Sequence, residues 1–551
     1  MSSGWICEGI AKDKKQHPNQ SPAGPHEPYE NFGTDCVICN LTKSQVQGGG
    51  GKAIPSTVPV TGIVVGMALL LVAGAGLWGI TRTCPEGTEK SLFFFCSASS
   101  RPVPDPPPTS EPKTEDATGL RQGLYSWEPE RFSWGNRTLF PGVGNRPRDE
   151  GIASFRSGKF QSASESFDRA VDGDRNDPEV LIFQNNALAQ AKGDPLTLAV
   201  VVPTDNRANS AKEMLRGVAM AQEQFNATQG VDGRLLEIVI ANDGNEPENA
   251  KQVAQALIAD NSILGVIGHN SSSASKAGLE YYEQAGLAMI SPTSTSTELV
   301  SDTFFRTVPS DAAAGERLAQ YVFSEIGIEK TVVFYNPNSS FSSSLQTSFE
   351  NRLADLGGKA VTVDMSASDF DAGIAMSTAA LQDQAEAALL FPNTDYTSVA
   401  IELAKANAKL PDDQRLELLG GDSLYSIDTL TAGGKSVEDL VLAIPWFANS
   451  AGVVDFSKRG EQQWGGPVNW RTAMSFDATQ AFIAALSVDA SRESVLESLT
   501  SVSLPDNETS GEAFEFTPEG ERQSDPILVK VVRGSVNRVP GSEFGYELVP
   551  E

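Results

Sequence analysis

The sequence predicts an α/β protein with two doubly wound βα lobes, preceded by a single transmembrane helix and a short helical repeat unit. From residue 195 to residue 551, short apolar segments alternate with amphipathic stretches, a pattern typical of parallel strands covered by helices on both faces. This region is longer than one doubly wound sheet requires, so two lobes account for it better than one. One long apolar run stands upstream, at residues 60–80.

The charge of the chain excludes one class of partner. The 551 residues include 71 acidic and 42 basic side chains, which gives a formal net charge of −29. Nucleic-acid binding needs clustered Lys and Arg side chains that displace counterions from the phosphates. We therefore exclude a nucleic-acid partner. The acidic excess indicates solubility and says little about the fold.

Residues 1–46 form a polar segment that contains candidate metal ligands. The Cys36-Val37-Ile38-Cys39 motif resembles half of a zinc ribbon, a fold in which cysteine thiolates hold a structural zinc ion. A complete ribbon has two close cysteine pairs, and Ile10 stands where the partner of Cys7 is expected. Structural zinc therefore remains one interpretation, and a degenerate remnant with free thiols is the other. The candidate ligands are Cys7, Cys36 and Cys39, with His17 or His26 as a fourth.

Residues 60–80 are predicted to form a transmembrane helix. The segment contains no charged side chain, and a helix of about 20 residues spans the roughly 30 Å hydrocarbon layer of a bilayer. A long polar region precedes it, so it is not an N-terminal secretion signal. The Gly-rich residues 47–59 are typical of a flexible linker. Positive charges flank the segment on both sides, so charge gives little information on its orientation.

Residues 81–146 follow as an extracytoplasmic linker rich in Pro, which favours stiff polyproline II structure. Cys84 and Cys96 lie near its start. These two residues form a disulfide in an oxidising compartment or stay as unpaired thiols, and the sequence leaves both interpretations open.

Residues 147–194 predict a helix pair. Phe155, Phe160 and Phe167 recur at helical spacing, and a second helix is expected after Asp177-Pro178, with Asp177 as its N-cap. The pattern resembles a tetratricopeptide repeat. One such pair buries little surface by itself, so we expect it to pack against another domain or a partner.

The main domain, residues 195–551, places polar loops directly after two of its strands. Ligands in open parallel sheets bind at the C-terminal ends of the strands. Residues 269–275 and 291–297 are rich in Ser and Thr hydroxyls, which suit an anion such as a carboxylate at a helix N-terminus, although simple helix capping needs some of them too. The predicted strands are Leu196–Val202, 235–241, 263–268, 287–290, 331–335, Ala387–Phe391 and 416–419, and the predicted helices are 208–228, 247–260, one starting at Ser273, 341–356 and 396–405.

Several ordered motifs in this domain carry a specific resemblance. IGHNSSSASKAGLEYYEQAGLAMISPTSTSTEL at 267–299 resembles the ligand loops of the leucine/isoleucine/valine-binding proteins, the extracytoplasmic receptors of one class of ABC importers. LRGVAMAQEQFN at 215–226, FRTVPSD at 305–311, GGDSLYS at 420–426 and SFDATQAFIAAL at 475–486 keep the order of the family. The resemblance implies the type I periplasmic binding protein fold, in which two lobes joined by a hinge enclose the ligand.

The resemblance also implies a ligand site. By position, the Ser272 hydroxyl binds the ligand carboxylate, with Ser273 beside it and Thr293 and Thr295 contributing from the next loop. Asp422 falls where the family holds an acidic partner for the α-ammonium group.

Two positions depart from the family pattern. Phe341 stands where many members have a Tyr that reaches the ligand from the second lobe, and Ser210 stands where several place an aromatic ring. The expected ligand is a small branched-chain or other aliphatic amino acid, but these departures leave its side chain undetermined.

The sequence argues against an enzyme. Gly421-Asp422-Ser423-Leu424 matches the nucleophile block of the GDSL esterases, but no His follows His269 to serve as a base. A pairing of His269 with a nearby Ser has poor geometry at a strand end. No Cys occurs after Cys96 and only His269 lies in the domain, so we expect neither thiol catalysis nor a metal or other cofactor there.

The resemblance implies the binding component of an ABC importer in the bacterial inner membrane. The chain is then anchored by a single span, has ABC permease subunits as partners, and has its large C-terminal domain in the periplasm or outside. A second interpretation is a sensor that relays amino-acid binding across the membrane to the N-terminal segment. A third, a scaffold whose binding site has decayed, is opposed by the intact Ser and Thr loops.

Overall fold

A computed structural model of the chain describes residues 124, 127–141, 144–487, 489–537 and 541–550, together with the backbone of four short strands upstream. Those strands form two antiparallel pairs, β1 (Trp5–Cys7) with β2 (Tyr29–Asn31) and β3 (Thr88–Lys90) with β4 (Cys96–Ala98). The chain divides into two units, Met1–Pro112 and Lys113–Glu551.

Several predictions fall on residues outside the described part. These are the transmembrane segment 60–80, the linker 47–59, Cys36, Cys39 and Cys84, and the side chains of Cys7 and Cys96. No helix of the described residues has the length and apolarity that a membrane crossing requires.

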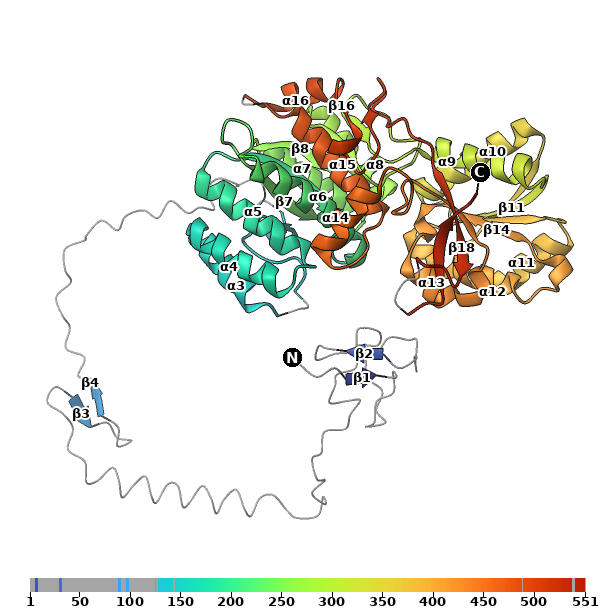
Figure 1. Cartoon of the computed structure of the whole chain (residues 1–551), viewed down its shortest axis with the longest axis horizontal. Helices are drawn as coiled ribbons and strands as arrows, with labels where there is room; N and C mark the ends of the chain where they lie inside the picture. The colour runs from blue at the N-terminus through green and yellow to red at the C-terminus, as the bar shows by residue number, and fades with distance from the viewer. Residues whose placement is uncertain are drawn as a thin grey trace, which may run out of the picture. The chain divides into compact units, whose positions relative to one another are not determined.

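The first lobe is built on a six-stranded sheet with the order β10-β9-β8-β6-β7-β5. Its strands run parallel except for β5, which pairs antiparallel with β7 at one edge. Helices of the same lobe flank this sheet (Figure 1). The elements are β5 (Phe132–Ser133), β6 (Leu196–Val202), α6 (Ala208–Ala227), β7 (Leu236–Asn242), α7 (Pro247–Ala259), β8 (Ile263–Ile267), α8 (Ser272–Gln284), β9 (Met289–Ser291) and β10 (Phe304–Arg306).

The second lobe has a seven-stranded sheet with the order β12-β11-β13-β14-β15-β18-β19, in which β18 and β19 are antiparallel to their neighbours. Along β13, Ala388 and Leu390 join the core under one face, whereas Ala387, Leu389 and Phe391 join the core under the other. Both faces are therefore buried, as continuous apolar strands predict. The elements are α9 (Asp311–Gln320), β11 (Lys330–Tyr335), α10 (Ser340–Leu356), β12 (Lys359–Asp364), α11 (Ala372–Leu381), β13 (Ala387–Phe391), α12 (Thr397–Asn407), β14 (Glu417–Gly420), α13 (Ile427–Gly433), β15 (Val441–Ile444), β18 (Ile527–Arg533) and β19 (Phe544–Leu548).

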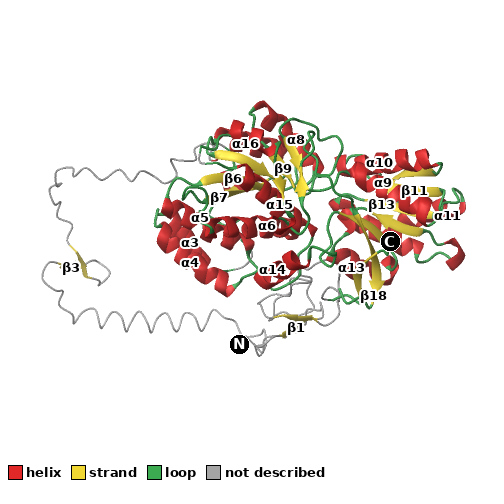
Figure 2. Cartoon of the chain, turned by 45° about the horizontal axis from the view of Figure 1, so that its top comes forward, coloured by secondary structure: helices red, strands yellow, loops and turns green. Residues whose placement is uncertain are grey.

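The chain crosses between the lobes three times, after β10, after β15 and before β18. The second crossing returns the chain to the first lobe, so that the red and orange helices near the C-terminus lie among green elements from much earlier in the sequence (Figure 1). Figure 2 shows one of these helices, α15 (Trp470–Ala485), beside α6 of the first lobe. Pro309, Pro445 and Pro526, one from each crossing, line one small cavity at this hinge. The returning elements are α14 (Val454–Trp464), α15 (Trp470–Ala485), α16 (Arg492–Leu499), β16 (Ser503–Leu504) and β17 (Phe514–Glu515).

The predicted helix pair is three helices, α3 (Arg146–Arg156), α4 (Phe160–Gly173) and α5 (Pro178–Lys192). The first predicted helix breaks at Gly158, whose φ of +69° is the left-handed conformation that Gly adopts easily. Asp177 caps α5 as predicted, accepting hydrogen bonds from the N–H groups of Glu179 and Val180. The expected packing against another domain is confirmed, because these helices share one hydrophobic core with the first lobe. The likeness to a tetratricopeptide repeat stays a prediction.

The strands and helices predicted in the main domain are confirmed, with boundaries that differ by only a few residues. The predicted strand at 235–241, for example, is β7, Leu236–Asn242, and the helix predicted to start at Ser273 starts at Ser272. The periodic apolar pattern therefore located the strands whose C-terminal ends carry the polar loops.

Candidate functional site

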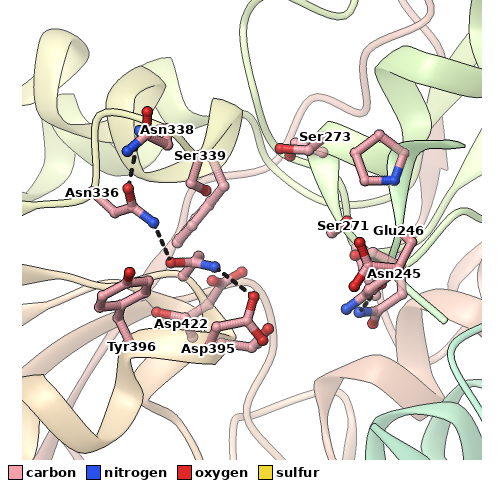
Figure 3. Close-up of a pocket in the computed structure, with 18 of the residues that line it drawn as sticks. Asn245, Glu246, Ser271, Ser273, Asn336, Asn338, Ser339, Asp395, Tyr396 and Asp422 are labelled. Carbon is pink, nitrogen blue, oxygen red and sulfur yellow. Dashed lines mark hydrogen bonds between the residues drawn. The ribbon is translucent and has the colours of Figure 1, made fainter. Parts of the chain in front are cut away.

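A cavity of about 260 Å³ lies between the two lobes. Residues of the first lobe, among them Asn245, Ser271 and Ser273, face residues of the second lobe, among them Asn336 and Asp422, across it (Figure 3). The cavity is slightly smaller than the roughly 300–1,000 Å³ of sites for drug-sized ligands, so it suits a small molecule. Its lining residues are Asn245, Glu246, Pro247, Asn270, Ser271, Ser272, Ser273, Thr293, Asn336, Asn338, Ser339, Phe341, Asn393, Thr394, Asp395, Tyr396, Asp422, Ser423, Trp470 and Arg471.

The N-terminus of α8 forms one wall of the cavity. Ser271 is the N-cap, and its hydroxyl accepts a hydrogen bond from the N–H of Ala274 at 3.3 Å. Ser272, the first helical residue, is only 2% exposed, and its Oγ accepts a hydrogen bond from the N–H of Ser296 at 3.3 Å. The hydroxyl proton of Ser272 stays available to donate, and the first backbone N–H groups of a helix have no partner within the helix. This wall is suited to an anion.

Ser273 and the residues around it also hold the lobes together. The hydroxyl of Ser273 accepts a hydrogen bond from the N–H of Ser340, at the start of α10 in the second lobe, at 3.3 Å. A second contact joins the N–H of Thr297 to the hydroxyl of Ser344 in α10 at 2.9 Å. The helix N-termini of the two lobes therefore meet beside the cavity.

The two predicted threonines occupy different places. Thr293 lines the cavity, and its hydroxyl donates to the backbone carbonyls of Asn270 and His269, at 2.9 and 3.2 Å. Thr295 instead lines the adjoining hinge cavity of about 20 Å³, together with Asp311. Burial raises the pKa of Asp311 to about 8, although the neighbouring hydroxyls of Thr295 and Ser344 oppose the shift.

The second lobe presents Phe341 and Asp422. Phe341 is near the start of α10, and Asp422 lies directly after β14. Ligands in open parallel sheets bind at the C-terminal ends of the strands, so this is a position expected for a functional side chain, and we call this expectation the strand-end rule. Asp422 is 9% exposed. Burial raises the pKa of this carboxyl to about 6, although the nearby Arg471 guanidinium opposes the shift. At neutral pH the carboxylate is mostly ionised and is suited to bind a cation.

A chain of amide hydrogen bonds supports this wall (Figure 3). The side-chain amide of Asn336 donates to Asn393 at 3.0 Å, and Asn393 donates in turn to Asp395 at 3.1 Å. Asp395 also forms an ion pair with Arg207 of the first lobe. This pair joins the two lobes through a residue that lines the cavity.

His269 lies behind the site and supports it. Its Nδ1 is 2.7 Å from the carboxylate of Asp243, its Nε2 is 3.0 Å from the hydroxyl of Tyr282, and all three residues are buried. Its backbone carbonyl accepts hydrogen bonds from Ser291 and Thr293. These contacts tie the loop after β8 to the loop after β9, so His269 is held in a structural network and does not face the cavity.

Trp470 and Arg471 line the cavity but were not among the predicted site residues. They begin α15, a helix that reaches the site after the second crossing between the lobes. The strand-end rule does not cover such a helix. The sequence feature that indicates a helix start here is Asn469-Trp470-Arg471, because Asn is a favoured N-cap residue and Asn469 caps α15.

The described part of the chain contains no group of three or more His, Cys, Asp or Glu side chains arranged to hold a metal ion. The cysteines proposed as zinc ligands, Cys7, Cys36 and Cys39, are outside that part or have side chains outside it. The zinc interpretation therefore stays a prediction.

Two α/β lobes that enclose a polar cavity, with three crossings between them, define a two-lobed binding protein. Residues 196–535, more than half of the chain, match the family model described as periplasmic binding protein. The chain belongs to this family.

Individual relatives agree with this assignment. A leucine-, isoleucine-, valine-, threonine- and alanine-binding protein of Pseudomonas aeruginosa is 30% identical over 183 residues, which cover 32% of this chain and 48% of that protein. The Leu/Ile/Val-binding protein of Escherichia coli is 23% identical over 311 residues, which cover 55% of this chain and 81% of the relative. The chain spans about half the length of the first curated relatives that it matches, at 48% and 43%.

The fold has counterparts among solved structures. A leucine-binding protein from Thermotoga maritima superposes with a TM-score of 0.55 at 20% identity, covering 64% of this chain and 97% of that one. A substrate-binding protein of an ABC transporter from Desulfitobacterium hafniense, in complex with Leu, gives 0.53 at 22% identity, covering 64% of this chain and all of that one. At such identities the likeness establishes the fold alone.

Proposed function

We propose that this chain is the extracytoplasmic solute-binding component of an ABC importer and that its two lobes close on a small amino acid. The observation that carries the proposal is the pair of opposed groups in the cavity. An anion-binding helix N-terminus with Ser272 stands on the first lobe, and the Asp422 carboxylate stands on the second. A zwitterion has one group for each wall.

The relatives support the transport role. Those named above bind leucine, isoleucine or valine according to their names, and they match this chain in the region that contains the cavity. Transport of the bound solute requires permease subunits in the membrane. We place these subunits as the partners of the two-lobed domain.

The location follows from the sequence upstream. Residues 60–80 anchor the chain in the bacterial inner membrane, with the binding domain on the periplasmic or outer side and residues 1–46 in the cytoplasm. Cys7, Cys36 and Cys39 then lie in a reducing compartment and are candidates to hold a structural zinc ion. Metal analysis of the purified full-length chain tests that part, since a Cys36→Ser variant should lose any zinc that is bound.

Calorimetry with the detergent-solubilised full-length chain tests the binding function. The twenty amino acids and the small amides form the ligand panel, and at least one amino acid should bind with a measurable heat. Absence of binding across the whole panel, from protein that melts in a single cooperative transition, would overturn the proposal.

A further inference from the structure

Two residues at the start of α15 that carry buried hydrogen-bond donors line the cavity. Trp470 is 1% exposed and Arg471 is 9% exposed, and both line the cavity. The indole Nε1 of Trp470 and the Nε of Arg471 make no hydrogen bond within the described residues. Buried donors in native proteins nearly always have a partner, and the described residues supply none for these two.

The Arg471 guanidinium is also without a close counter-charge. No carboxylate of the described residues lies within 4.0 Å of it. Glu213 is near, but its carboxylate accepts a hydrogen bond from Thr472 at 2.6 Å and pairs with Arg216. Asp422 is near as well, on the opposite lobe. A buried cation without a partner is costly, and an anion placed beside it removes that cost.

Arg471 is held in place before any ligand arrives. Its guanidinium lies over the indole ring of Trp470, 4.1 Å from the ring centroid. Its backbone N–H donates to the side chain of Asn469 at 2.8 Å, which fixes the first turn of the helix. A stacked guanidinium loses little conformational freedom when it binds a carboxylate, which favours tight binding.

Part of the remaining cavity wall is polar. Its lining includes the side-chain amides of Asn245, Asn270, Asn336 and Asn393, and its large apolar surfaces are aromatic rings. An isoleucine or leucine side chain offers none of these groups a hydrogen bond. The amides of Asn270, Asn336 and Asn393 already donate one hydrogen bond each, to Asn245, Asn393 and Asp395 respectively. A ligand side chain with acceptor atoms would accept a further one from their second N–H groups, which favours a polar ligand side chain.

We infer that the ligand is an acidic amino acid, whose side-chain carboxylate binds Arg471 and the indole N–H of Trp470. This inference rests on the proposed function and replaces the aliphatic side chain that the family resemblance implies. The α-carboxylate meets the N-terminus of α8 with Ser272, and the α-ammonium meets Asp422. Each of the three charges of the ligand then has a complementary group on the protein.

Calorimetry with the detergent-solubilised full-length chain tests the inference, using glutamate, aspartate, glutamine and leucine as ligands. Glutamate or aspartate should bind most tightly. Arg471→Met should weaken that binding roughly 10- to 150-fold, the range of a charge-assisted hydrogen bond, and should weaken leucine binding by a smaller factor, because loss of the guanidinium raises the pKa of Asp422 further. Trp470→Phe, which removes only the indole N–H and keeps an aromatic ring, should weaken acidic ligands by a smaller factor.

The matched control is Arg459→Met, the same substitution at an exposed arginine that stacks on Phe456 away from the cavity. It should leave all affinities unchanged. If leucine or glutamine binds more tightly than both acids, or if Arg471→Met and Trp470→Phe keep the wild-type selectivity, the inference is wrong while the proposed function stands. If no amino acid binds wild type, the proposed function itself fails. Should Arg471→Met not fold, Arg471→Lys and Trp470→Phe decide the matter.

Discussion

The hydroxyl of Ser272 has two roles that can be separated experimentally. Its oxygen accepts a hydrogen bond from the N–H of Ser296, and its proton is free to donate into the cavity. Ser272→Ala removes both. Ligand affinity should fall roughly 10- to 150-fold because a charge-assisted hydrogen bond is lost, and the backbone N–H groups that remain should preserve weak binding.

The same variant should also unfold at a slightly lower temperature, since the Ser296 N–H is left without an acceptor in a buried loop. Ser491→Ala is a suitable control, because Ser491 caps α16 and does not line the cavity. The control should lose about 1 kcal/mol of stability and keep its affinity. A Ser272→Ala protein that melts early and binds as well as wild type would make Ser272 a structural residue only.

Asp422 predicts that affinity depends on pH. Its pKa is raised to about 6 in the free protein, and only the ionised form attracts an ammonium group. Lowering the pH therefore reduces the fraction of protein in which Asp422 is ionised, and ligand affinity should fall about tenfold between pH 7 and pH 5. Asp422→Asn should bind weakly with little change over that range. Calorimetry at several pH values in buffers of different ionisation enthalpy gives both the affinity and the protons taken up.

The contribution of Asp422 to the stability of the free protein should fall as the pH rises, whereas ligand affinity rises. A carboxyl whose folded-state pKa is above its unfolded value binds more protons when folded, so its contribution to the free energy of unfolding falls as pH rises. For Asp422 that loss occurs between about pH 4 and pH 6, and for Asp311, whose pKa is about 8, it continues toward pH 8. If the free energy of unfolding of the wild type does not fall relative to that of Asp422→Asn over pH 4–6, the raised pKa of Asp422 is contradicted.

Sequence reasoning located part of this site for a definite physical reason. The loops that carry Ser272, Ser273 and Thr293 were predicted because they follow parallel strands, whose C-terminal ends meet at one edge of the sheet, whereas Asp422 was predicted from the family resemblance. Trp470 and Arg471 could not be predicted in this way, because they begin a helix and do not follow a strand. The chain crossings that bring α15 to the cavity leave no periodic pattern of apolar residues in the sequence.

Helix packing sets the position of α15, and Gly217 in α6 permits its close approach. A Cβ atom at Gly217 would lie 2.2 Å from the carbonyl oxygen of Thr472 and 2.6 Å from the backbone nitrogen of Phe476. Gly217→Ala should therefore force the two helices apart and cost about 1–3 kcal/mol in the free energy of unfolding. Because α15 begins with Trp470 and Arg471, ligand affinity should fall as well. Urea unfolding and calorimetry measure the two effects.

Gly173→Ala is the matched control for that experiment. Gly173 is the last residue of α4, and a Cβ atom there meets nothing within 4 Å. Its stability should change by less than about 0.5 kcal/mol, and its affinity should not change. An unchanged affinity in Gly217→Ala would mean that the position of α15 does not determine binding.

The elements themselves were more predictable than their connections. Apolar periodicity predicted β6, β7, β8 and β9 of the first sheet and β11, β13 and β14 of the second, since each of these buried strands is apolar on both faces. It did not predict β10, β12, β15, β18 and β19. It did not give the break at Gly158, because apolar residues continue at helical spacing on both sides of it. Nor did it give β5, two residues that pair with the edge strand β7.

At the scale of the whole molecule, the two lobes are joined by three crossings and by polar contacts beside the cavity. Arg207 pairs with Asp395, and Ser273 accepts a hydrogen bond from Ser340. These contacts are few and polar, whereas each lobe has its own hydrophobic core. A ligand that contacts both lobes therefore adds a substantial share of the free energy that holds them together.

Every residue of the cavity lies between Asn245 and Arg471, inside the unit Lys113–Glu551. The apolar run at 60–80 lies outside that unit. Membrane attachment and ligand binding should therefore be separable. A variant without residues 1–112 should be released in soluble form and should bind ligand with the affinity of the full-length chain, whereas the full-length chain should require detergent for extraction.

A charge variant distinguishes a membrane span from weaker association. Leu70 and Leu71 are central in the apolar run, and a Lys at the bilayer centre costs roughly 2.5–3.5 kcal/mol on insertion scales. The double variant Leu70→Lys/Leu71→Lys should therefore lose its membrane attachment and keep its binding affinity. Fractionation after high-salt and alkaline washes, followed by calorimetry on each fraction, measures both properties. Full-length protein that washes off in salt alone would mean that residues 60–80 do not span the bilayer.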